Sequence, residues 1–298
     1  MLKVNTKTDL TITVVTNTYK RSTDLVSRSL YSSLKQSDYL EQVILIDQND
    51  PPLNLPQDIT NHPKFRRIKS ESNCVSVARN SLLKEEIEGW IIFCDDDGYF
   101  DDNYLETFVS VVKENPDVRI FAGSIIRDDN FEFYSPRHKI GGDLNKFINT
   151  KLLMGSNFSV QSEIFRELNG FDERFGAGSY WGSGEETDFA WKAYFHKIKM
   201  KYSPELRVLH IKPYAGDFSS SCDKAFRYGR GKGALVSKWL IFNRKSLVLL
   251  ELLEMILLPI FQFIKLILRL KIKTSIYPIC ALTGRIRGFL LALLCKHY

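Results

Sequence analysis

Residues 90–100 read WIIFCDDDGYF, an apolar run that ends in three consecutive aspartates. Three other short runs have the same strand-like character: Leu10–Thr16 (LTITVVT), Val43–Asp47 (VILID) and Val118–Gly123 (VRIFAG). Strands that are apolar throughout, and separated by helices, are typical of a parallel sheet that is covered on both faces. The sequence therefore predicts an α/β fold.

Helical patterns lie between these strands, at Ser22–Leu34, Val75–Glu86 and Asn103–Lys113. Ligands of such sheets bind at the carboxyl ends of the strands. Polar residues follow three of the expected strands there: Thr16–Arg21, Asp47–Asp50 and Asp95–Asp97. We therefore expect a binding site along this edge of the sheet.

Charge is distributed unevenly along the 298 residues, whose net charge is +6. Residues 1–223 carry 27 Lys and Arg against 33 Asp and Glu, whereas residues 224–298 carry 14 against 2. An acidic body with a basic, Leu-rich tail suggests a catalytic or binding domain joined to a segment that meets an anionic surface. The 44% apolar content excludes a disordered tail and a collagen-like repeat.

Five widely spaced cysteines contain no CxxC pair, so neither a disulfide framework nor a zinc site has the spacing it needs. The start, MLKVNTKTDLTITVV, lacks the apolar segment of a secretory signal. These features predict a protein of the reducing cytosol. We expect no nucleic-acid partner, and the sequence leaves the oligomeric state open.

Asp95 and Asp97 flank Asp96 in the strongest local motif. Residues i and i+2 of an extended segment point the same way, so these two carboxylates can face one ligand. Paired carboxylates suit a hard cation, Mg²⁺ or Mn²⁺, which adds waters and phosphate oxygens as further ligands. The alternative is an acidic turn that merely closes a strand.

A second acidic motif, Gly184–Asp188 (GEETD), precedes the helical pattern FAWKAYFHK. Acids in a first helical turn are stabilised by the helix dipole, which is a sufficient structural explanation. The functional interpretation is that one of these acids is a general base. Burial and a neighbouring acid would raise its pKa toward the working range. Glu185, Glu186 and Asp188 are the candidates.

Two further features carry weaker signals. His210, in RVLHIK, is either a packed imidazole or a ligand of a metal or phosphate. The run Gly229–Gly233 (GRGKG) lacks the spacing of a nucleotide-binding loop. We expect it to form a basic loop with Arg227, Arg230 and Lys232, close to phosphate or simply solvated.

Several motifs, in order, give the chain a resemblance to family 2 glycosyltransferases over about residues 10–233. TVVTNTYKR (13–21) resembles the opening strand and loop of that family, and VILIDQND (43–50) the second strand. NCVSVARN (73–80) is similar to the N-x-G-x-x-x-ARN segment, with Val75 where Gly is usual. CDDDGYF (94–100) matches the DxD metal motif. GSNFSVQSEIFRELNGFDERFG (155–176) and GSGEETDF (182–189) match the acceptor-side blocks.

The resemblance implies a GT-A-type fold, a mixed and mostly parallel sheet flanked by helices. It also implies roles at the donor side of the site. Asp47 should contact the nucleoside, Asp97 and Asp95 should bridge metal and diphosphate, and His210 should face the same diphosphate. The remaining donor-side residues implied in this way are Thr16, Thr18, Arg21, Asn73, Arg79 and Asp96.

At the acceptor side, the resemblance places Glu186 where the family usually has the Asp of a Glu-Asp pair, the general base. Glu185 and Asp188 remain alternatives. Tyr180 and Trp181 are candidates for stacking on a sugar, with Trp181 as a core residue the alternative, and Asn157 is an implied acceptor contact. Residues 126–150 are polar and irregular, and we expect a surface loop that helps to exclude water.

The function implied is inverting transfer of a sugar, with a UDP-sugar favoured, from a nucleotide-diphosphate donor to the hydroxyl of a saccharide or lipid-linked acceptor. Cell-surface polysaccharide or glycolipid synthesis is the expected context. A catalytically silent nucleotide-sugar-binding relative is one alternative, and a metal-dependent phosphotransferase is another. A dinucleotide oxidoreductase is disfavoured, because no Gly-rich fingerprint follows the first strand.

Residues 1–233 are predicted to form the catalytic domain, with a nucleotide-binding part over about 8–125 and an acceptor part over about 126–215. Residues 234–298 are predicted to associate with a membrane. Within Ser246–Leu270, five polar residues share one strip of a helix, about 80° wide at 100° per residue, which leaves a broad apolar face: Glu251, Glu254, Gln262, Lys265 and Arg269.

Pro259 should kink this helix, and its charges leave no apolar stretch of the roughly 20 residues that a span needs. A second apolar piece, Gly288–Cys295, ends the chain. A broad apolar face with basic flanks predicts an in-plane helix on an anionic membrane surface. The protein would then be peripheral on the inner face of the cell membrane. Packing of this face on the catalytic domain or on a second subunit is the alternative.

Overall fold

The computed structural model describes residues 10–36, 38–211 and 216–295. The predicted start of the nucleotide-binding part, before residue 10, lies outside these residues, as do residues 212–215, where the predicted acceptor part ends. The described chain separates into two compact units. One contains residues up to Phe171 and from Phe189 to 212, and the other contains Asp172–Asp188 and the C-terminal helices.

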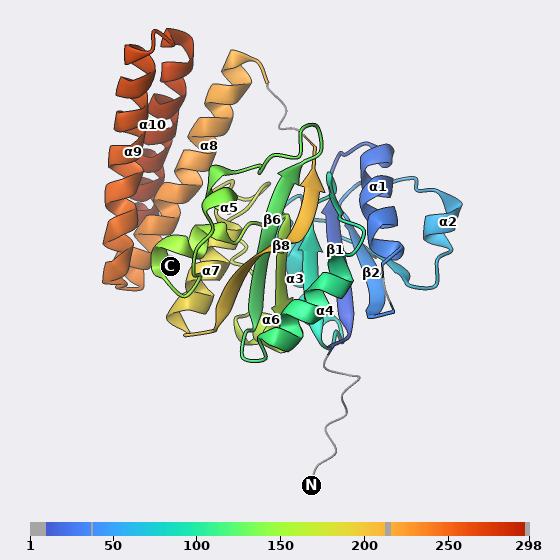
Figure 1. The fold of residues 1–298 in the computed structure, drawn as a ribbon. Coiled ribbons are helices and arrows are strands. Elements are labelled where there is room, and N and C mark those ends of the chain that lie inside the picture. The colour runs from blue at the N-terminus through green and yellow to red at the C-terminus, as the bar shows by residue number, and fades with distance from the viewer. Residues whose placement is uncertain (1–9, 37, 212–215, 296–298) are drawn as a thin grey trace. The chain divides into compact units, whose positions relative to one another are not determined.

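The first unit contains one mixed sheet, of eight strands among the described residues, in the order β3-β2-β1-β4-β7-β6-β8-β5 (Figure 1). The strands are β1 (Ile12–Thr18), β2 (Leu40–Asp47), β3 (Phe65–Lys69), β4 (Trp90–Cys94), β5 (Gly98–Phe100), β6 (Ile120–Arg127), β7 (Asn157–Gln161) and β8 (Met200–His210). Strands β1 to β4 are mutually parallel, and β7 lies antiparallel between β4 and β6. The predicted sheet is therefore confirmed.

Helices cover both faces of this sheet, because side chains along each buried strand alternate between two apolar clusters. In β1, for example, Val14 belongs to one cluster and Val15 to the other. The Val14 cluster includes residues of α1 (Thr23–Leu34) and α4 (Tyr104–Glu114). The Val15 cluster includes residues of α3 (Val75–Asn80) and α6 (Ser162–Glu167), so these four helices lie in two layers, one on each face of the sheet (Figure 1).

The edge predicted from the sequence is formed by the topology. The parallel strands β1, β2 and β4 end there, in Thr18, Asp47 and Cys94. Strand β8 pairs in parallel with β6, and β6 and β4 are both antiparallel to β7. Because β8 thus runs in the direction of β4, its last residue, His210, reaches the same edge. Pairing of Gly98 with His210 places β8 beside the three aspartates.

Several predicted boundaries need correction. The helix expected over Val75–Glu86 ends as α3 at Asn80, and a 3₁₀ segment continues to Lys84. The expected loop at 126–150 begins inside β6 and contains α5 (Pro136–Ile140) and part of a 3₁₀ segment, Phe147–Leu152. Apolar residues are the physical reason, since Leu144 and Phe147 are buried there. A short helix, α2 (Gln57–Thr60), was not predicted.

The second unit contains three long helices, α8 (Phe218–Ser237), α9 (Leu249–Leu268) and α10 (Ile272–Leu294). A π-helical segment, Lys238–Phe242, and a 3₁₀ turn, Ser246–Val248, connect α8 to α9. The second apolar piece predicted at Gly288–Cys295 is only the end of α10, which continues through Pro278. By length and composition alone, two helical segments could cross a membrane, Ser246–Leu268 and Ile272–Leu294.

The GRGKG run is not the predicted loop, because it lies inside α8. Glycines disfavour a helix by about 1 kcal/mol each, but these meet another backbone. A Cβ at Gly229 would collide with the carbonyl of Ala281, and one at Gly233 with that of Arg285. From α10, Gly284 and Gly288 approach the backbone of α8 in the same way. Small residues spaced by four allow this close helix packing.

Candidate active site

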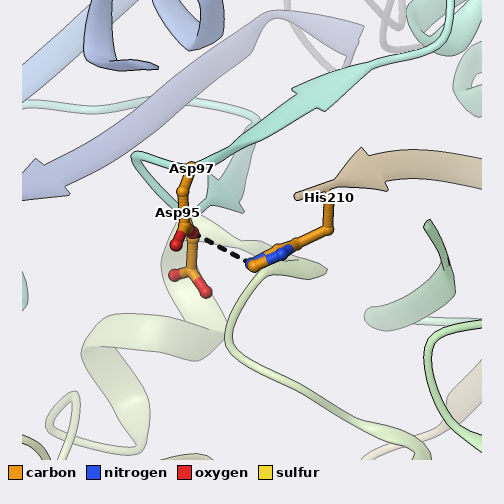
Figure 2. Close-up of side chains that lie close together, drawn as sticks. All are labelled: Asp95, Asp97 and His210. Carbon is orange, nitrogen blue, oxygen red and sulfur yellow. Dashed lines mark ion pairs between the residues drawn. The ribbon is translucent and has the colours of Figure 1, made fainter. Parts of the chain in front are cut away.

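A carboxylate cluster at the predicted edge contains Asp95, Asp97 and His210 (Figure 2). The aspartates follow β4, and His210 ends β8. One potential ligand atom from each residue lies within 4.8 Å of the others. Asp97 Oδ1 is 2.9 Å from His210 Nε2, the contact drawn in Figure 2. The geometry thus brings together the three residues that the sequence proposed as metal ligands.

The donor set of this cluster suits a divalent cation. Two carboxylates supply the hard oxygen ligands that Mg²⁺ and Mn²⁺ prefer, whereas an imidazole is a less usual partner of Mg²⁺. His210 Nδ1 is 2.9 Å from the carbonyl of Ile211, a contact that can orient the ring with Nε2 toward Asp97. The predicted metal site therefore has compatible side chains, and Mg²⁺ versus Mn²⁺ is not distinguished by them.

Burial and hydrogen bonding shift the pKa values of this pair in opposite directions. Burial acts to raise the pKa of Asp97, but the hydrogen bond and charge of His210 outweigh it and lower the pKa overall. Burial acts to lower the pKa of His210, and contact with Asp97 outweighs it and raises that pKa above its ordinary value. Each residue thus favours the charged form of the other.

Two arginines pair with the three aspartates. Arg21 donates to Asp96 Oδ1 at 3.0 Å and lies 2.9 Å from Asp97 Oδ2. Arg79, which is 2% exposed, donates through Nη2 to Asp95 Oδ1 at 3.0 Å and through Nε to Asn17 at 2.9 Å. Both arginines were predicted at the donor side. They supply positive charge beside the carboxylates.

The Asp96 side chain is bound by other side chains of the protein, Thr18 and Arg21. Its Oδ2 accepts a hydrogen bond from Thr18 at 2.8 Å, and its side chain is 9% exposed. Burial raises its pKa to about 6, a rise that Arg21 and the Thr18 hydrogen bond limit. Thr16 is fully buried, and its hydroxyl has no hydrogen-bond partner among the described residues. The donor-binding roles of Asp96, Thr16 and Thr18 remain predictions.

A cavity of about 320 Å³ opens beside these residues, at the carboxyl ends of β1, β2 and β3. Asn73, a predicted donor-side residue, is among those that line it. Tyr19 and Gln48 also line it, and both lie within the strand-end ranges predicted to form the binding edge. Lys69 was not predicted, although its position at the end of β3 is a signal that could have identified it.

Asp47 is fully buried, and the loop that follows it uses both of its oxygens. Oδ1 accepts from the backbone and side chain of Asn49 at 3.0 and 2.8 Å, and Oδ2 accepts from the backbone of Leu53 at 2.8 Å. Arg67 lies 3.5 Å from Oδ2. The structure thus gives Asp47 a role in shaping the cavity, and its nucleoside contact stays a prediction.

The predicted acceptor-side residues have contrasting environments. Asn157 is 1% exposed and donates to the carbonyls of Ser124 and Leu206 at 2.7 and 2.9 Å, so it connects three strands internally. In the second unit, Trp181 is 2% exposed, which agrees with the core alternative, whereas Tyr180 is 62% exposed. Their acceptor-binding roles are not tested by these positions.

The three candidate bases lie in the first turn of α7 (Glu185–Phe195). Asp188 is fully buried, and its Oδ1 accepts from Lys238 at 2.6 Å and from Trp239 at 2.7 Å. Glu185 is 7% exposed, and Glu186 is half-buried. Asp188 therefore forms an ion pair at a fully buried position, whereas Glu186 is only half-buried.

Comparison with known proteins identifies related sequences and folds. The model of a family described as "Glycosyl transferase family 2" matches residues 13–169. A glucosyl-dolichyl phosphate glucuronosyltransferase of Haloferax volcanii is 25% identical over 181 residues, which cover 55% of this chain and 57% of that protein. The chain thus spans little more than half the length of this relative.

Two solved structures share the fold at low sequence identity. TarS 1–349 of S. aureus, in complex with UDP-GlcNAc, is 17% identical with a TM-score of 0.57, over 78% of this chain and 67% of that one. The mannosyltransferase PcManGT from Pyrobaculum calidifontis, in complex with GDP-Man and Mn²⁺, is 13% identical with a TM-score of 0.57, over 92% and 86%. These likenesses confirm the predicted fold class.

Proposed function

Because the chain belongs to glycosyl transferase family 2, we propose that it transfers a sugar from a nucleotide-diphosphate sugar to an acceptor hydroxyl, with inversion at the anomeric carbon. The observation that carries this proposal is the carboxylate cluster between Arg21 and Arg79 at the strand ends. Charge of both signs, concentrated at one edge, suits a cation and a diphosphate together. We propose a UDP-sugar as the donor, as in the TarS complex.

The residues of the site have distinct roles in this proposed reaction. A divalent cation held by Asp95, Asp97 and His210 would supply positive charge to the diphosphate that leaves. Arg79 keeps Asp95 oriented, and Arg21 does the same for Asp96 and Asp97. Glu186 accepts the proton of the acceptor hydroxyl, as a general base. Residues lining the cavity of Asn73 contact the nucleoside.

The test combines a donor panel with two variants. Purified protein is titrated with UDP-, GDP- and dTDP-sugars with Mn²⁺ or with a chelator, and transfer is measured with saccharide and lipid-linked acceptors. Asp97→Asn should abolish metal-dependent donor binding and transfer, because it removes a charge that the cation needs. Asp102→Asn, whose side chain is 81% exposed, is the control and should behave as the wild type. Full activity of Asp97→Asn in chelator would refute the metal assignment.

We propose further that the α9–α10 hairpin meets a membrane. Apart from Met255, its buried residues are small or polar, and include Glu251, Pro259, Ser275, Gly284 and Gly288. Many of its exposed residues are large and apolar: Leu257, Phe261, Leu268, Leu290 and Leu294 are 53–78% exposed. This polarity is the reverse of that of a helix on a water-soluble protein. It supports contact with lipid.

The packing of α10 along α8 supports a hairpin that lies in the plane of the membrane rather than one that spans it. The rings of Phe218 and Tyr277 lie 5.5 Å apart near the starts of α8 and α10, and Gly233 meets the backbone of Arg285 and Phe289 near their ends. The two helices therefore run side by side in parallel. A spanning α10 would take the exposed charges of α8, such as Lys224 and Arg227, into hydrocarbon. Each costs about 2.5–3.5 kcal/mol at the centre of a bilayer.

The proposed location is the cytoplasmic face of the cell membrane, where a lipid-linked acceptor would be within reach. The Haloferax volcanii relative is named for a dolichyl phosphate substrate, which supports an acceptor of this class. Flotation with vesicles containing phosphatidylglycerol tests the contact. The double variant Leu257→Glu/Phe261→Glu should move from the vesicle to the soluble fraction. Full-length protein that ignores these vesicles would refute the membrane proposal.

A further inference from the structure

Lys238 lies between two carboxylates directly after the end of α8. Its Nζ donates to Asp172 Oδ2 at 2.7 Å and to Asp188 Oδ1 at 2.6 Å. The next residue, Trp239, donates from Nε1 to the same Asp188 oxygen at 2.7 Å. The Lys238 side chain is 10% exposed, and that of Asp188 is fully buried. We refer to Asp172, Asp188, Lys238 and Trp239 as the Lys238 cluster.

The two carboxylates of this cluster are the ends of one segment, Asp172–Asp188. Four glycines in this segment have positive φ values between 79° and 101°: Gly176, Gly178, Gly182 and Gly184. Such residues leave the unfolded chain many conformations, so fixing the segment costs conformational entropy. A single lysine that binds both ends restricts the segment much as a crosslink restricts a loop.

Arg174 brings a second positive charge to the cluster. Arg174 donates to Asp172 from Nε at 2.8 Å and from Nη2 at 2.5 Å. Burial acts to raise the pKa of Asp172, but the hydrogen bonds and charges of Arg174 and Lys238 outweigh it and lower that pKa. Two cations thus face two carboxylates. Removal of Lys238 would leave Asp188 as a buried carboxylate that has lost its positive partner, which is strongly unfavourable.

Two further contacts fix α8 to the same segment. Arg230 Nη2 donates to the carbonyl of Tyr180 at 2.7 Å, and Ser183 Oγ donates to the carbonyl of Tyr228 at 3.2 Å. A Cβ at Gly231 would collide with the hydroxyl of Ser183. The segment is therefore held along the last three turns of α8, with the Lys238 cluster as its charged end.

We propose that Lys238 and Trp239 are positioning residues that hold the first turn of α7, and so the carboxylate of Glu186, in its reactive arrangement. The inference rests on the general-base role proposed above for Glu186, which lies two residues before Asp188 in that turn. Neither Lys238 nor Trp239 needs to touch the substrate for this effect. They act through Asp188.

The main test uses Lys238→Met, Lys238→Arg and Trp239→Phe in the full chain. Lys224→Met, an exposed lysine on the same helix, is the matched control. Lys238→Met should lower kcat by about tenfold or more, because the base is no longer held in place. The Kd for the nucleotide-sugar should change less than about twofold. Lys238→Arg should restore part of kcat, and Trp239→Phe should lower it less than Lys238→Met.

A pH profile separates positioning from general loss of structure. Lys238→Met removes a positive charge that contacts the first turn of α7, and this loss disfavours the ionised form of a carboxyl in that turn. The acid limb of kcat should consequently move to higher pH. The same limb should not move in Lys224→Met. Unchanged kcat and an unchanged pH profile in both Lys238→Met and Trp239→Phe would overturn the proposal.

A readout without substrate keeps the inference independent of the proposed function. Arg174, whose side chain is 40% exposed, offers a tryptic site inside the segment. Cleavage after Arg174, followed by mass spectrometry, should be about tenfold faster in Lys238→Met. If the wild type transfers no sugar, the proposed function fails, and this cleavage rate alone decides whether the cluster holds the segment. If Lys238→Met does not fold, Trp239→Phe decides, and wild-type cleavage and kcat in it would overturn the proposal.

Discussion

Replacing Arg79 with methionine should lower the stability of the protein more than the loss of an exposed ion pair does, because the Arg79–Asp95 pair has a buried cation. The guanidinium is 2% exposed and donates to Asp95 and Asn17 at 3.0 and 2.9 Å. It also lies 5.2 Å from the ring centroid of Phe93 and 5.8 Å from that of Phe171. Methionine keeps the apolar stem and removes the charge, so Asp95 loses its internal partner.

The structure sets the size of the effect. Breaking a buried ion pair by removing one partner costs about 3–5 kcal/mol. The Asp95 side chain is 35% exposed, so water can replace part of what it loses. Methionine also retains contact with the two aromatic rings. We therefore expect the lower end of the range, a loss of about 3 kcal/mol in the free energy of unfolding.

Urea unfolding with linear extrapolation measures this loss, and Mn²⁺ titration measures the effect on Asp95. Arg66→Met is the matched control, because Arg66 pairs with Glu85 at 2.7 Å but has a side chain that is 49% exposed. An exposed pair contributes about 0–1 kcal/mol. The Arg79 variant should therefore be less stable than the Arg66 variant by about 2 kcal/mol or more and should bind Mn²⁺ more weakly. Equal stability and equal Mn²⁺ affinity of the two variants would refute the reasoning.

Three further changes test other parts of the molecule. Glu186→Gln should lower kcat by about 100-fold or more with donor Kd retained; a silent variant would move the base to Glu185 or Asp188. Because the pKa of Asp172 is lowered on folding, its stabilisation is present above the unfolded pKa of about 3.9 and is lost as pH falls through the folded value. Urea unfolding from pH 6 to pH 2 should thus show a smaller stability difference between wild type and Asp172→Asn in acid; a constant difference contradicts this. Gly284→Leu should lower the unfolding free energy in detergent by about 1–3 kcal/mol, because its side chain meets the Phe226 carbonyl; wild-type stability would disprove this packing.

The strands that the sequence predicts are those whose pattern is local. Strands β1, β2 and β4 contain runs of β-branched or apolar residues, and the runs in β2 and β4 lead directly into acids. Strand β7 (NFSVQ) was not predicted, since its short alternating pattern is also common at a surface, although four of its five residues are buried. Strand β8 contains Pro204, a residue that argues against a strand when only the sequence is known. The strand accommodates it with an irregular pairing to β6.

Some features of the site could likewise be predicted from the sequence, and others could not. Asp95, Asp97 and His210 meet because topology brings strand ends to one edge, and this rule applies without knowledge of side-chain contacts. The use of each oxygen does not follow from such a rule. Asp47 ends a strand as predicted, yet the loop that follows it occupies both of its oxygens. The glycines of GRGKG were predicted to form a loop, because glycine is common in turns. They lie in a helix instead, where they allow the backbone of α10 to approach α8 closely, and the sequence does not reveal such an approach.

Glu251 shows why the C-terminal polarity needed the structure. A helical wheel places it in a polar strip that would face water, but it is 1% exposed and pairs with Lys232 of α8. Arg285 of α10 also turns inward, where it donates to the carbonyl of Met255 at 2.9 Å. Glu251 and Arg285 thus contribute to the interior of the hairpin, and many of its leucines are exposed together with its remaining cations, such as Lys265 and Arg269. A soluble helix pair gains stability from the opposite arrangement, so a lipid surface is the environment in which this one costs least.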